Sequence, residues 1–277
     1  MSLAYDTYDA IEAVRWSALS HLRESPAHYQ AALAHPREST PALELGIAAH
    51  MAILEPDRFA SEVAVWEGGT RRGKLWDAWK EANAGKLHLR TQDVDPLLCM
   101  REAVRAHPAA APLLDSGEAE VSLTWDCPET GLACKARADW LHVESDAALL
   151  VDLKTARTTC PRRFARAVAD YGYHGQLAHY AEGVAAVHGV PVEAVRVVIV
   201  AVEKAPPYDV VVYELDHGIP DGALHVGREL RTDLMRQLAQ CIEADHWPGR
   251  SEGVESLCLP GWALGDVADE LTFGDEE

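Results

Sequence analysis

The sequence predicts a single domain of the α/β (or α+β) class, in which a central mixed β-sheet is flanked by helices. Three observations predict this class. Helical periodicity fills the first 60 residues, alternation of polar and apolar residues takes over between 120 and 143, and helices and strands then alternate up to residue 246. With 277 residues, 48% of them hydrophobic, the chain can build one sizeable core.

The first part of the domain, residues 1–115, is expected to be mainly helical. Apolar residues at three- and four-residue spacing predict a helix over Tyr8–Ala34. Thr40 followed by Pro41 is typical of a helix N-terminus and starts a second helix, which ends at Pro56. Three shorter elements complete this part: a strand over 62–66, a helix over 75–85 and a helix over Asp93–Ala106.

The middle part, residues 116–216, is expected to form the sheet. Alternating segments at 120–125 and 133–143 flank a turn at 128–131, and the apolar segment 147–153 follows, which predicts a three-stranded meander with a buried last strand. The next elements are helices over Pro161–Asp170 and Tyr173–His188, strands over Arg196–Glu203 and Asp209–Leu215, and a long helix over 221–246. We expect the domain to span residues 1–250 and the acidic segment 251–277 to form a loosely held tail.

The charge of the chain excludes a generic basic nucleic-acid binder. The formal net charge is −19, and residues 205–277 alone hold 4 basic and 16 acidic side chains. A polyanionic substrate is still compatible with the sequence if metal ions or a local basic lining supply positive charge.

Other chemistries find little support. Six scattered cysteines without a CxxC pair argue against a structural zinc site, an iron–sulfur cluster or a disulfide framework. Because no apolar run approaches a membrane span and the first residues do not read as a secretory signal, we expect a soluble, cytoplasmic protein without a membrane partner.

The strongest chemical signal is a pair of acids on two adjacent predicted strands. Asp139 lies on one strand, and Asp152 lies on the next with Lys154 two residues later, so the last two side chains share a face. If the turn between the strands places Asp139 opposite Asp152, two carboxylates and an ammonium converge. That set suits Mg²⁺ or Mn²⁺, and the lysine could orient or deprotonate a metal-bound water. The alternative is a surface strand with a stray ion pair.

Six segments in order resemble one nuclease family. They are GIAAH (46–50), RRGKLWDAW (71–79), EVSLTW (120–125), TGLACKARADWL (130–141), VDLKT (151–155) and YGYHGQLAHY (171–180). Residues 39 to about 190 thereby resemble the PD-(D/E)XK nuclease superfamily, whose members have a restriction-endonuclease-like fold. Within it they resemble the exodeoxyribonuclease VIII-like branch of phage and prophage recombination systems.

The resemblance implies roles for individual residues. It implies metal ligation by His50, Asp139, Asp152 and the Leu153 carbonyl, with Lys154 as the catalytic lysine. It also implies that Gln176 and Tyr180, four residues apart on one helix face, lie beside the active site, although both could equally be polar caps on a packing face. Glu120 is the expected additional acid, and Glu118 is an alternative for that role.

Basic residues near these segments are candidate DNA contacts. They are Arg71, Arg72 and Lys74, then Arg137, and then Arg157, Arg162, Arg163 and Arg166 directly after the lysine strand. A solvated helix face is the alternative explanation for such runs. The segment from Gly68 to Lys74 also approaches a P-loop, but Leu75 stands where a P-loop has Ser or Thr, which argues against an ATP site.

The expected function is Mg²⁺- or Mn²⁺-dependent exonuclease activity on linear double-stranded DNA, with 5′ to 3′ resection of ends implied by the resemblance. The alternatives are an endonuclease or a repair nuclease of other polarity, and a catalytically decayed DNA-end-binding module. The resemblance also implies a single-strand annealing protein as a partner. Because the −19 chain should repel DNA, we expect a homo-oligomeric ring, a trimer or a tetramer, with the basic clusters facing a central passage.

Overall fold

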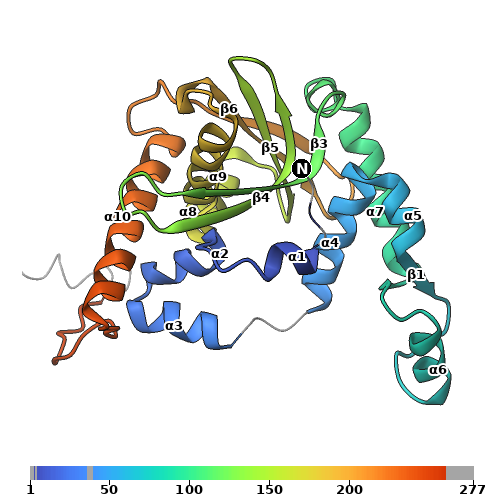
Figure 1. Ribbon diagram of the computed structural model, residues 1–277. Coiled ribbons are helices and arrows are strands. Elements are labelled where there is room, and N and C mark those ends of the chain that lie inside the picture. Colours follow the sequence, from blue (N-terminus) through green and yellow to red (C-terminus); the bar gives the residue numbers. More distant parts are fainter. Residues whose placement is uncertain (1–2, 4, 36–39, 260–277) are drawn as a thin grey trace, which may run out of the picture.

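A five-stranded mixed sheet forms the centre of the computed structural model, which describes residues 3, 5–35 and 40–259 (Figure 1). The first three strands are an antiparallel meander, the fourth pairs in parallel with the third, and the fifth is antiparallel to the fourth. In spatial order the strands are β3 (Glu118–Asp126), β4 (Ala133–Val143), β5 (Ala148–Ala156), β6 (Val195–Glu203) and β7 (Val210–Leu215). The expected mixed sheet flanked by helices is therefore confirmed.

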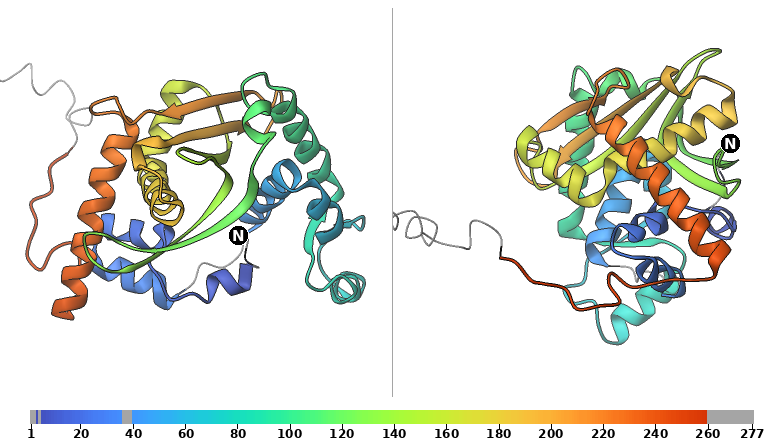
Figure 2. Two further views of the ribbon diagram at one scale, coloured as in Figure 1. Left: turned by 45° about the horizontal axis from the view of Figure 1, so that its top comes forward. Right: turned by 90° about the vertical axis from the view of Figure 1, so that its left-hand side faces the viewer.

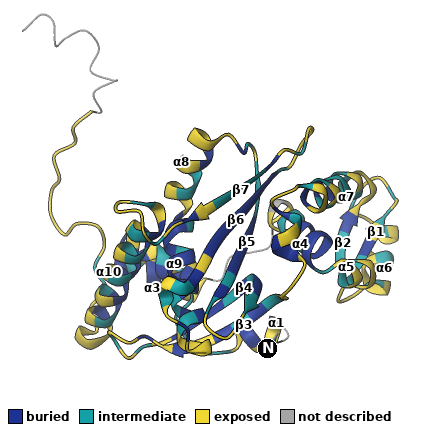
Figure 3. Ribbon diagram, turned by 90° about the horizontal axis from the view of Figure 1, so that it is seen from above, coloured by how far each residue is buried: buried dark blue, intermediate teal, exposed yellow. Residues whose placement is uncertain are grey.

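Helices cover both faces of this sheet (Figure 3). One face packs on α9 (Tyr173–His188) and α10 (Ala223–Ala244), and the other packs on α4 (Pro41–Leu54) and α7 (Thr91–Ala106). The apolar β6 is buried against both cores, with alternate residues on each side, as expected for a strand in the middle of a covered sheet. Two cores thus hold the sheet from either side.

The segment Tyr8–Ala34 is largely helical, as its periodicity indicates, but it is not one continuous helix, because it forms four short elements. They are α1 (Tyr5–Asp9), α2 (Trp16–Leu19), the 3₁₀ turn η1 (Ser20–Arg23) and α3 (Pro26–Ala34). Val14 leaves the helical path to form a bridge with Cys134 of β4. Ser25 then caps a new helix whose first residue is Pro26. Tertiary pairing and a cap therefore interrupt the helical pattern.

A small unit, which we call the projecting unit, extends away from the sheet between residues 63 and 90 (Figure 1). After α5 (Pro56–Glu62), two short parallel strands enclose a helix, in the order β1 (Val63–Trp66), α6 (Lys74–Ala82) and β2 (Leu87–Arg90). The rings of Trp66, Trp76, Trp79 and His88 pack together in this unit. Strand β2 was not predicted from the sequence, since four residues are too few to show a pattern.

Helix α8 (Pro161–Tyr171), which follows β5, lies close to its predicted bounds. The short 3₁₀ turns η2 (Ala111–Leu114) and η3 (Val192–Ala194) were not predicted from the sequence. Within the described part of the chain, no helix is both long and apolar enough to cross a membrane. Residues 251–259 are exposed and have no helix or strand, and the rest of the expected acidic tail lies outside the described residues.

Helices α9 and α10 lie side by side, and glycines permit their close approach (Figure 2). A Cβ at Gly227 of α10 would lie 2.2 Å from the His174 carbonyl oxygen of α9, whereas a Cβ at Gly46 of α4 would meet nothing within 4 Å. The two glycines thus offer a matched pair of substitutions.

We predict that G227A and G46A change stability in opposite directions. G227A should lower the free energy of unfolding by about 1–3 kcal/mol because a backbone carbonyl blocks the new methyl group. G46A should raise it by up to about 1 kcal/mol because alanine loses less backbone entropy in a helix. Urea unfolding followed by circular dichroism measures both, and shifts of the same sign would contradict the packing described.

Candidate active site

The candidate site lies where strands β3, β4 and β5 separate. The β4–β5 pairing ends at Trp140 and Val151, one residue before Asp139 and Asp152. On the other side of β4, the register sets Glu120 opposite Asp139, but the strands do not pair at that position. The sheet is therefore open at the position of the three acids.

Strand β3 changes the face it presents at this point. Ala119 packs on the α4 side of the sheet and Val121 on the α9 side, although residues two apart in a regular strand share a face. Glu120, between them, has a φ of 54°, in the left-handed region that non-glycine residues seldom adopt. Backbone strain of this kind costs roughly 1–3 kcal/mol, and residues with such strain cluster at functional sites.

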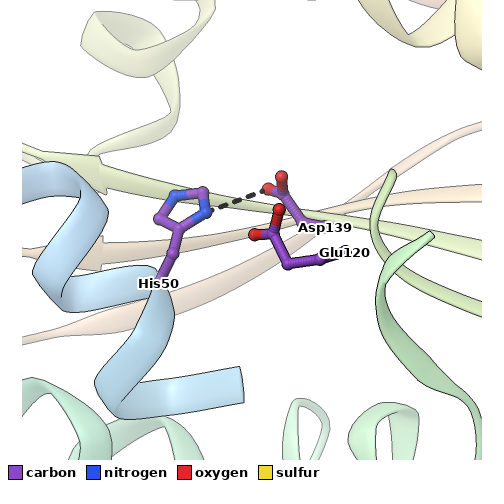
Figure 4. Close-up of side chains that lie close together, drawn as sticks. All are labelled: His50, Glu120 and Asp139. Atoms are coloured by element: carbon purple, nitrogen blue, oxygen red, sulfur yellow. Dashed lines mark ion pairs between the residues drawn. The ribbon is translucent and has the colours of Figure 1, made fainter. Parts of the chain in front are cut away.

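Three side chains from three elements converge in the opening (Figure 4). One ligand atom from each of His50, Glu120 and Asp139 lies within 4.8 Å of the other two, and His50 Nδ1 is 3.6 Å from Asp139 Oδ2. The Leu153 backbone N–H of β5 donates to the same Asp139 oxygen at 2.8 Å. The fold thus brings Glu120 to this cluster, while Glu118 is exposed at the start of β3.

Asp152 and Lys154 form a buried pair next to the cluster. Asp152 is 1% exposed, and Lys154 Nζ lies 2.7 Å from its Oδ2 and donates to its Oδ1 at 2.9 Å. Lys154 also donates to Gln176 Oε1 at 3.2 Å, and the Gln176 amide donates to the Tyr180 hydroxyl at 3.2 Å. The predicted pair on α9 therefore holds the lysine from the opposite side.

Burial and neighbouring charges shift the pKa values of the three acids, of His50 and of Lys154. Burial raises the pKa of Asp152 to about 6, against the opposing charge of Lys154, and it also raises the pKa of Asp139. The pKa of Glu120 is raised by burial and by the charge of Asp139. Burial and the charge of Lys154 lower the pKa of His50, so its imidazole is neutral at pH 7. For Lys154, burial lowers the pKa, but the charges of Asp152 and Asp139 outweigh it and leave it raised.

These observations fit a divalent cation. The buried Asp152 Oδ2 has only the Lys154 ammonium beside it among the described residues, at 2.7 Å, and the cluster of a neutral histidine with two carboxylates is a set that Mg²⁺ or Mn²⁺ can use. The Leu153 backbone partly offsets the lowering of the His50 pKa, so this backbone segment adjoins the cluster. A possible acidic metal site is thus present.

The predicted basic residues fall into three groups. Arg137 is 11% exposed and donates to Glu120 Oε2 at 2.6 Å, so its charge balances the charge of Glu120 within the site. Arg71 donates to the His88 carbonyl at 2.6 Å and lies over Trp76, whereas Arg72 and Lys74 are exposed on the projecting unit. The four arginines after β5 are all exposed: Arg157, Arg162, Arg163 and Arg166.

Two residues near Lys154, Tyr173 and Lys204, were not predicted from the sequence to be part of the site. The Tyr173 ring lies 4.6 Å from Lys154 Nζ, and Lys204 shares a pocket with Lys154. The spacing of Tyr173 three residues before Gln176 could have indicated a shared helix face. Lys204 comes from the turn after β6, and no local pattern indicates that it lies near β5.

The raised pKa of Asp152 predicts a pH-dependent cost in the metal-free protein. At pH values between 3.8, the ordinary pKa of an aspartate, and about 6, Asp152 holds a proton in the folded state that it releases in the unfolded chain. The contribution of Asp152 to the free energy of unfolding therefore falls as the pH rises through that window. D152N keeps the volume but cannot titrate, and it removes the carboxylate partner of Lys154 at every pH. The fall in the free energy of unfolding between pH 4 and pH 7.5 in EDTA should therefore be smaller in D152N than in the parental protein, by on the order of 1–3 kcal/mol.

Urea unfolding at pH 4 and pH 7.5 measures this, with D146N on the exposed β4–β5 turn as the matched control. A D152N protein that loses as much stability between these two pH values as the parental protein would contradict the assigned cost.

Comparisons with known proteins agree with the fold. The model of a family described as a PDDEXK-like domain of unknown function (DUF3799) matches residues 16–260. The crystal structure of a putative exonuclease from Eubacterium rectale covers 96% of this chain and 99% of its own, with 14% identity and a TM-score of 0.58, and shows a similar fold. The structure of SSO0001 covers 79% of this chain and 85% of its own, with 16% identity and a TM-score of 0.30, too low to carry an argument. No curated protein matches the chain. Because the family match runs from α2 through the whole sheet and past α10, the chain belongs to the PDDEXK-like domains.

Proposed function

We propose that this protein is a divalent-metal-dependent nuclease that degrades linear double-stranded DNA from its ends. The observation that carries the proposal is the opening of the sheet where His50, Glu120 and Asp139 meet beside the buried Asp152–Lys154 pair. Membership of the PDDEXK-like domains supports nuclease chemistry. The exonuclease mode, the 5′ to 3′ polarity and a role in phage-type recombination rest on the resemblance to the exodeoxyribonuclease VIII-like branch.

In this proposal the acids and His50 hold the metal. His50, Asp139, Asp152 and the Leu153 carbonyl would bind Mg²⁺ or Mn²⁺, with Glu120 beside them and fixed by Arg137. A bound divalent cation stabilises negative charge on a phosphate and on the leaving oxygen. Neutral His50 has a lone pair for a cation, and the low dielectric around the buried acids strengthens every charge interaction there.

Lys154 has a separate role, because a raised pKa keeps it protonated. A protonated amine has three N–H donors and no lone pair, so it cannot act as a metal ligand. Asp152 and Gln176 hold the ammonium in place, and it can position a water molecule or a phosphate oxygen at the edge of the metal cluster.

The first test is digestion of end-labelled DNA. We expect the parental protein to degrade linear duplex in Mg²⁺, to leave closed circular duplex intact and to lose activity in EDTA. D152N should reduce the rate at least about 10³-fold, because one charge is lost from the metal set without a change in volume. The matched control is D146N, which should cleave at the parental rate.

The outcomes separate the alternatives. Cleavage of the circle would indicate an endonuclease, and release of label from the opposite end would reverse the polarity. DNA binding without any cleavage in Mg²⁺ or Mn²⁺ would indicate a decayed end-binding module. A D152N protein that digests linear duplex at the parental rate would contradict the site itself.

The role of Lys154 predicts that K154A separates turnover from metal binding. The cleavage rate should fall by about 10²–10⁴-fold, while the Mn²⁺ affinity at pH 8, measured by calorimetric titration, should change less than about tenfold. K86A, on the exposed end of the projecting unit, is the control. Loss of Mn²⁺ binding in K154A, or cleavage at the parental rate, would contradict the positioning role.

We also propose a homo-oligomer, a trimer or a tetramer, that encircles DNA. The net charge of −19 should repel DNA over a Debye length of roughly 8–10 Å, so a basic inner surface shared by several subunits would favour its entry. A single-strand annealing protein is the proposed partner, on the resemblance alone. Light scattering behind size exclusion tests the oligomer, and a mass of 30.3 kDa at micromolar concentration would contradict it.

A further inference from the structure

A cationic pocket opens beside Lys154, and none of the cluster residues His50, Glu120 and Asp139 lines it. It has a volume of about 640 Å³ and is lined by residues of β5, the loop after it, α8, the start of α9 and the turn after β6. Its charged lining residues are Lys154, Arg157, Arg163 and Lys204, with no carboxylate among the described residues that line it. We call it the lysine pocket.

The surface beside His50 has a different character. A second pocket, of about 490 Å³, is lined by His50 and Glu120 of the cluster, by Glu55, Arg58 and Arg137, and by a few apolar side chains. Both of its arginines are paired with carboxylates of the same lining, Arg58 with Glu55 at 3.0 Å and Arg137 with Glu120 at 2.6 Å. A positive lining without a carboxylate among its described residues is therefore a property of the lysine pocket and not of this second pocket. A strand whose phosphate reaches the metal cluster finds its next favourable contacts in the lysine pocket.

The two loops that form the lysine pocket are tied to each other. Thr159, after β5, donates from its backbone N–H to Glu203 Oε1 at 3.0 Å and from its hydroxyl to Asp209 Oδ2 at 2.8 Å. The Lys204 N–H donates to the Ala156 carbonyl at 3.0 Å, which joins the turn after β6 directly to the end of β5. The pocket is thus held in shape before a ligand binds, which lowers the entropic cost of binding.

Aromatic rings extend from Lys154 to the solvent. Lys154 Nζ lies 4.6 Å from the Tyr173 ring, and that ring stacks on Tyr171 at a centroid distance of 5.5 Å. Both tyrosines line the pocket, and Tyr171 is 67% exposed. An exposed ring beside cationic side chains is the combination with which proteins bind unpaired nucleotides, because bases stack on the ring while cations contact phosphates.

We propose that the lysine pocket binds one unpaired nucleotide of the DNA strand, directly next to the phosphate that is cleaved. Lys204 and Arg163 contact its phosphates and Tyr171 stacks on its base. The volume suits a ligand of nucleotide size, since pockets of roughly 300–1,000 Å³ hold small molecules. A base inside a duplex is stacked on both faces, so it cannot also stack on Tyr171. This inference rests on the proposed nuclease function and adds that the substrate end is single-stranded at the site.

The test is binding of fluorescent duplexes by anisotropy in the D152N background, in EDTA, so that cleavage does not interfere. The probes are a blunt duplex and two duplexes with four-nucleotide overhangs, one with a 5′ and one with a 3′ overhang. At least one overhang should bind roughly 5- to 150-fold tighter than the blunt end. Adding Y171A should remove that difference, and adding Y171F should retain it. K204A should weaken overhang binding and reduce the slope of log affinity against log salt by about one.

R236A, an exposed arginine on α10 outside the pocket, is the charge control and should leave the overhang preference unchanged. Equal binding of all three ends, or an overhang preference that survives both Y171A and K204A, would overturn the pocket. A free nucleotide that displaces no overhang at millimolar concentration supports a strand rather than a mononucleotide ligand, and complete displacement at micromolar concentration overturns the strand assignment.

Cleavage by the parental protein is measured separately in Mg²⁺. An overhang preference without cleavage would refute the nuclease function and leave the pocket standing, whereas cleavage without such a preference would refute the pocket alone.

Discussion

The buried carboxylate of Asp152 is the constraint on which the candidate site depends. It lies on the central sheet, 1% exposed, and among the described residues the Lys154 ammonium is the one group that contacts its two oxygens, at 2.7 and 2.9 Å. A buried charge is tolerated only where partners compensate for its lost hydration. Lys154 supplies that compensation in part, Gln176 holds Lys154 in place, and the pKa of Asp152 stays raised. The remaining cost is what a divalent cation at this position would offset.

The opening of the sheet follows from the same arrangement. Two regular antiparallel strands would carry Asp139 and Asp152 as a paired row, but the β4–β5 ladder stops just before them and Asp139 accepts the Leu153 N–H instead. Glu120 reaches the gap through a left-handed backbone conformation, and strand pairing alone would not require that conformation. Local strain and an interrupted ladder thus form part of the site, and the two cores on either side of the sheet hold them in place.

Prediction from the sequence worked where the signal is local. Strand β4 and helix α9 have the predicted bounds, because alternation and helical periodicity run unbroken through them. The pairing of Asp152 with Lys154 follows from strand geometry, and the contact between Asp139 and β5 from the turn between the strands. Features set by distant segments could not be predicted in this way: the bridge of Val14 to β4, the left-handed backbone of Glu120 and the position of Lys204 in the site all depend on tertiary packing.

The lysine pocket also resolves the conflict between the −19 chain and an anionic substrate. The arginines beside His50 are paired with glutamates, whereas the lysine pocket has no carboxylate among the described residues that line it. Charges at these short distances act with little screening, whereas the overall negative field acts mainly beyond the Debye length, where salt weakens it. The site therefore presents positive charge to a strand that has reached it, although the chain as a whole repels one that has not.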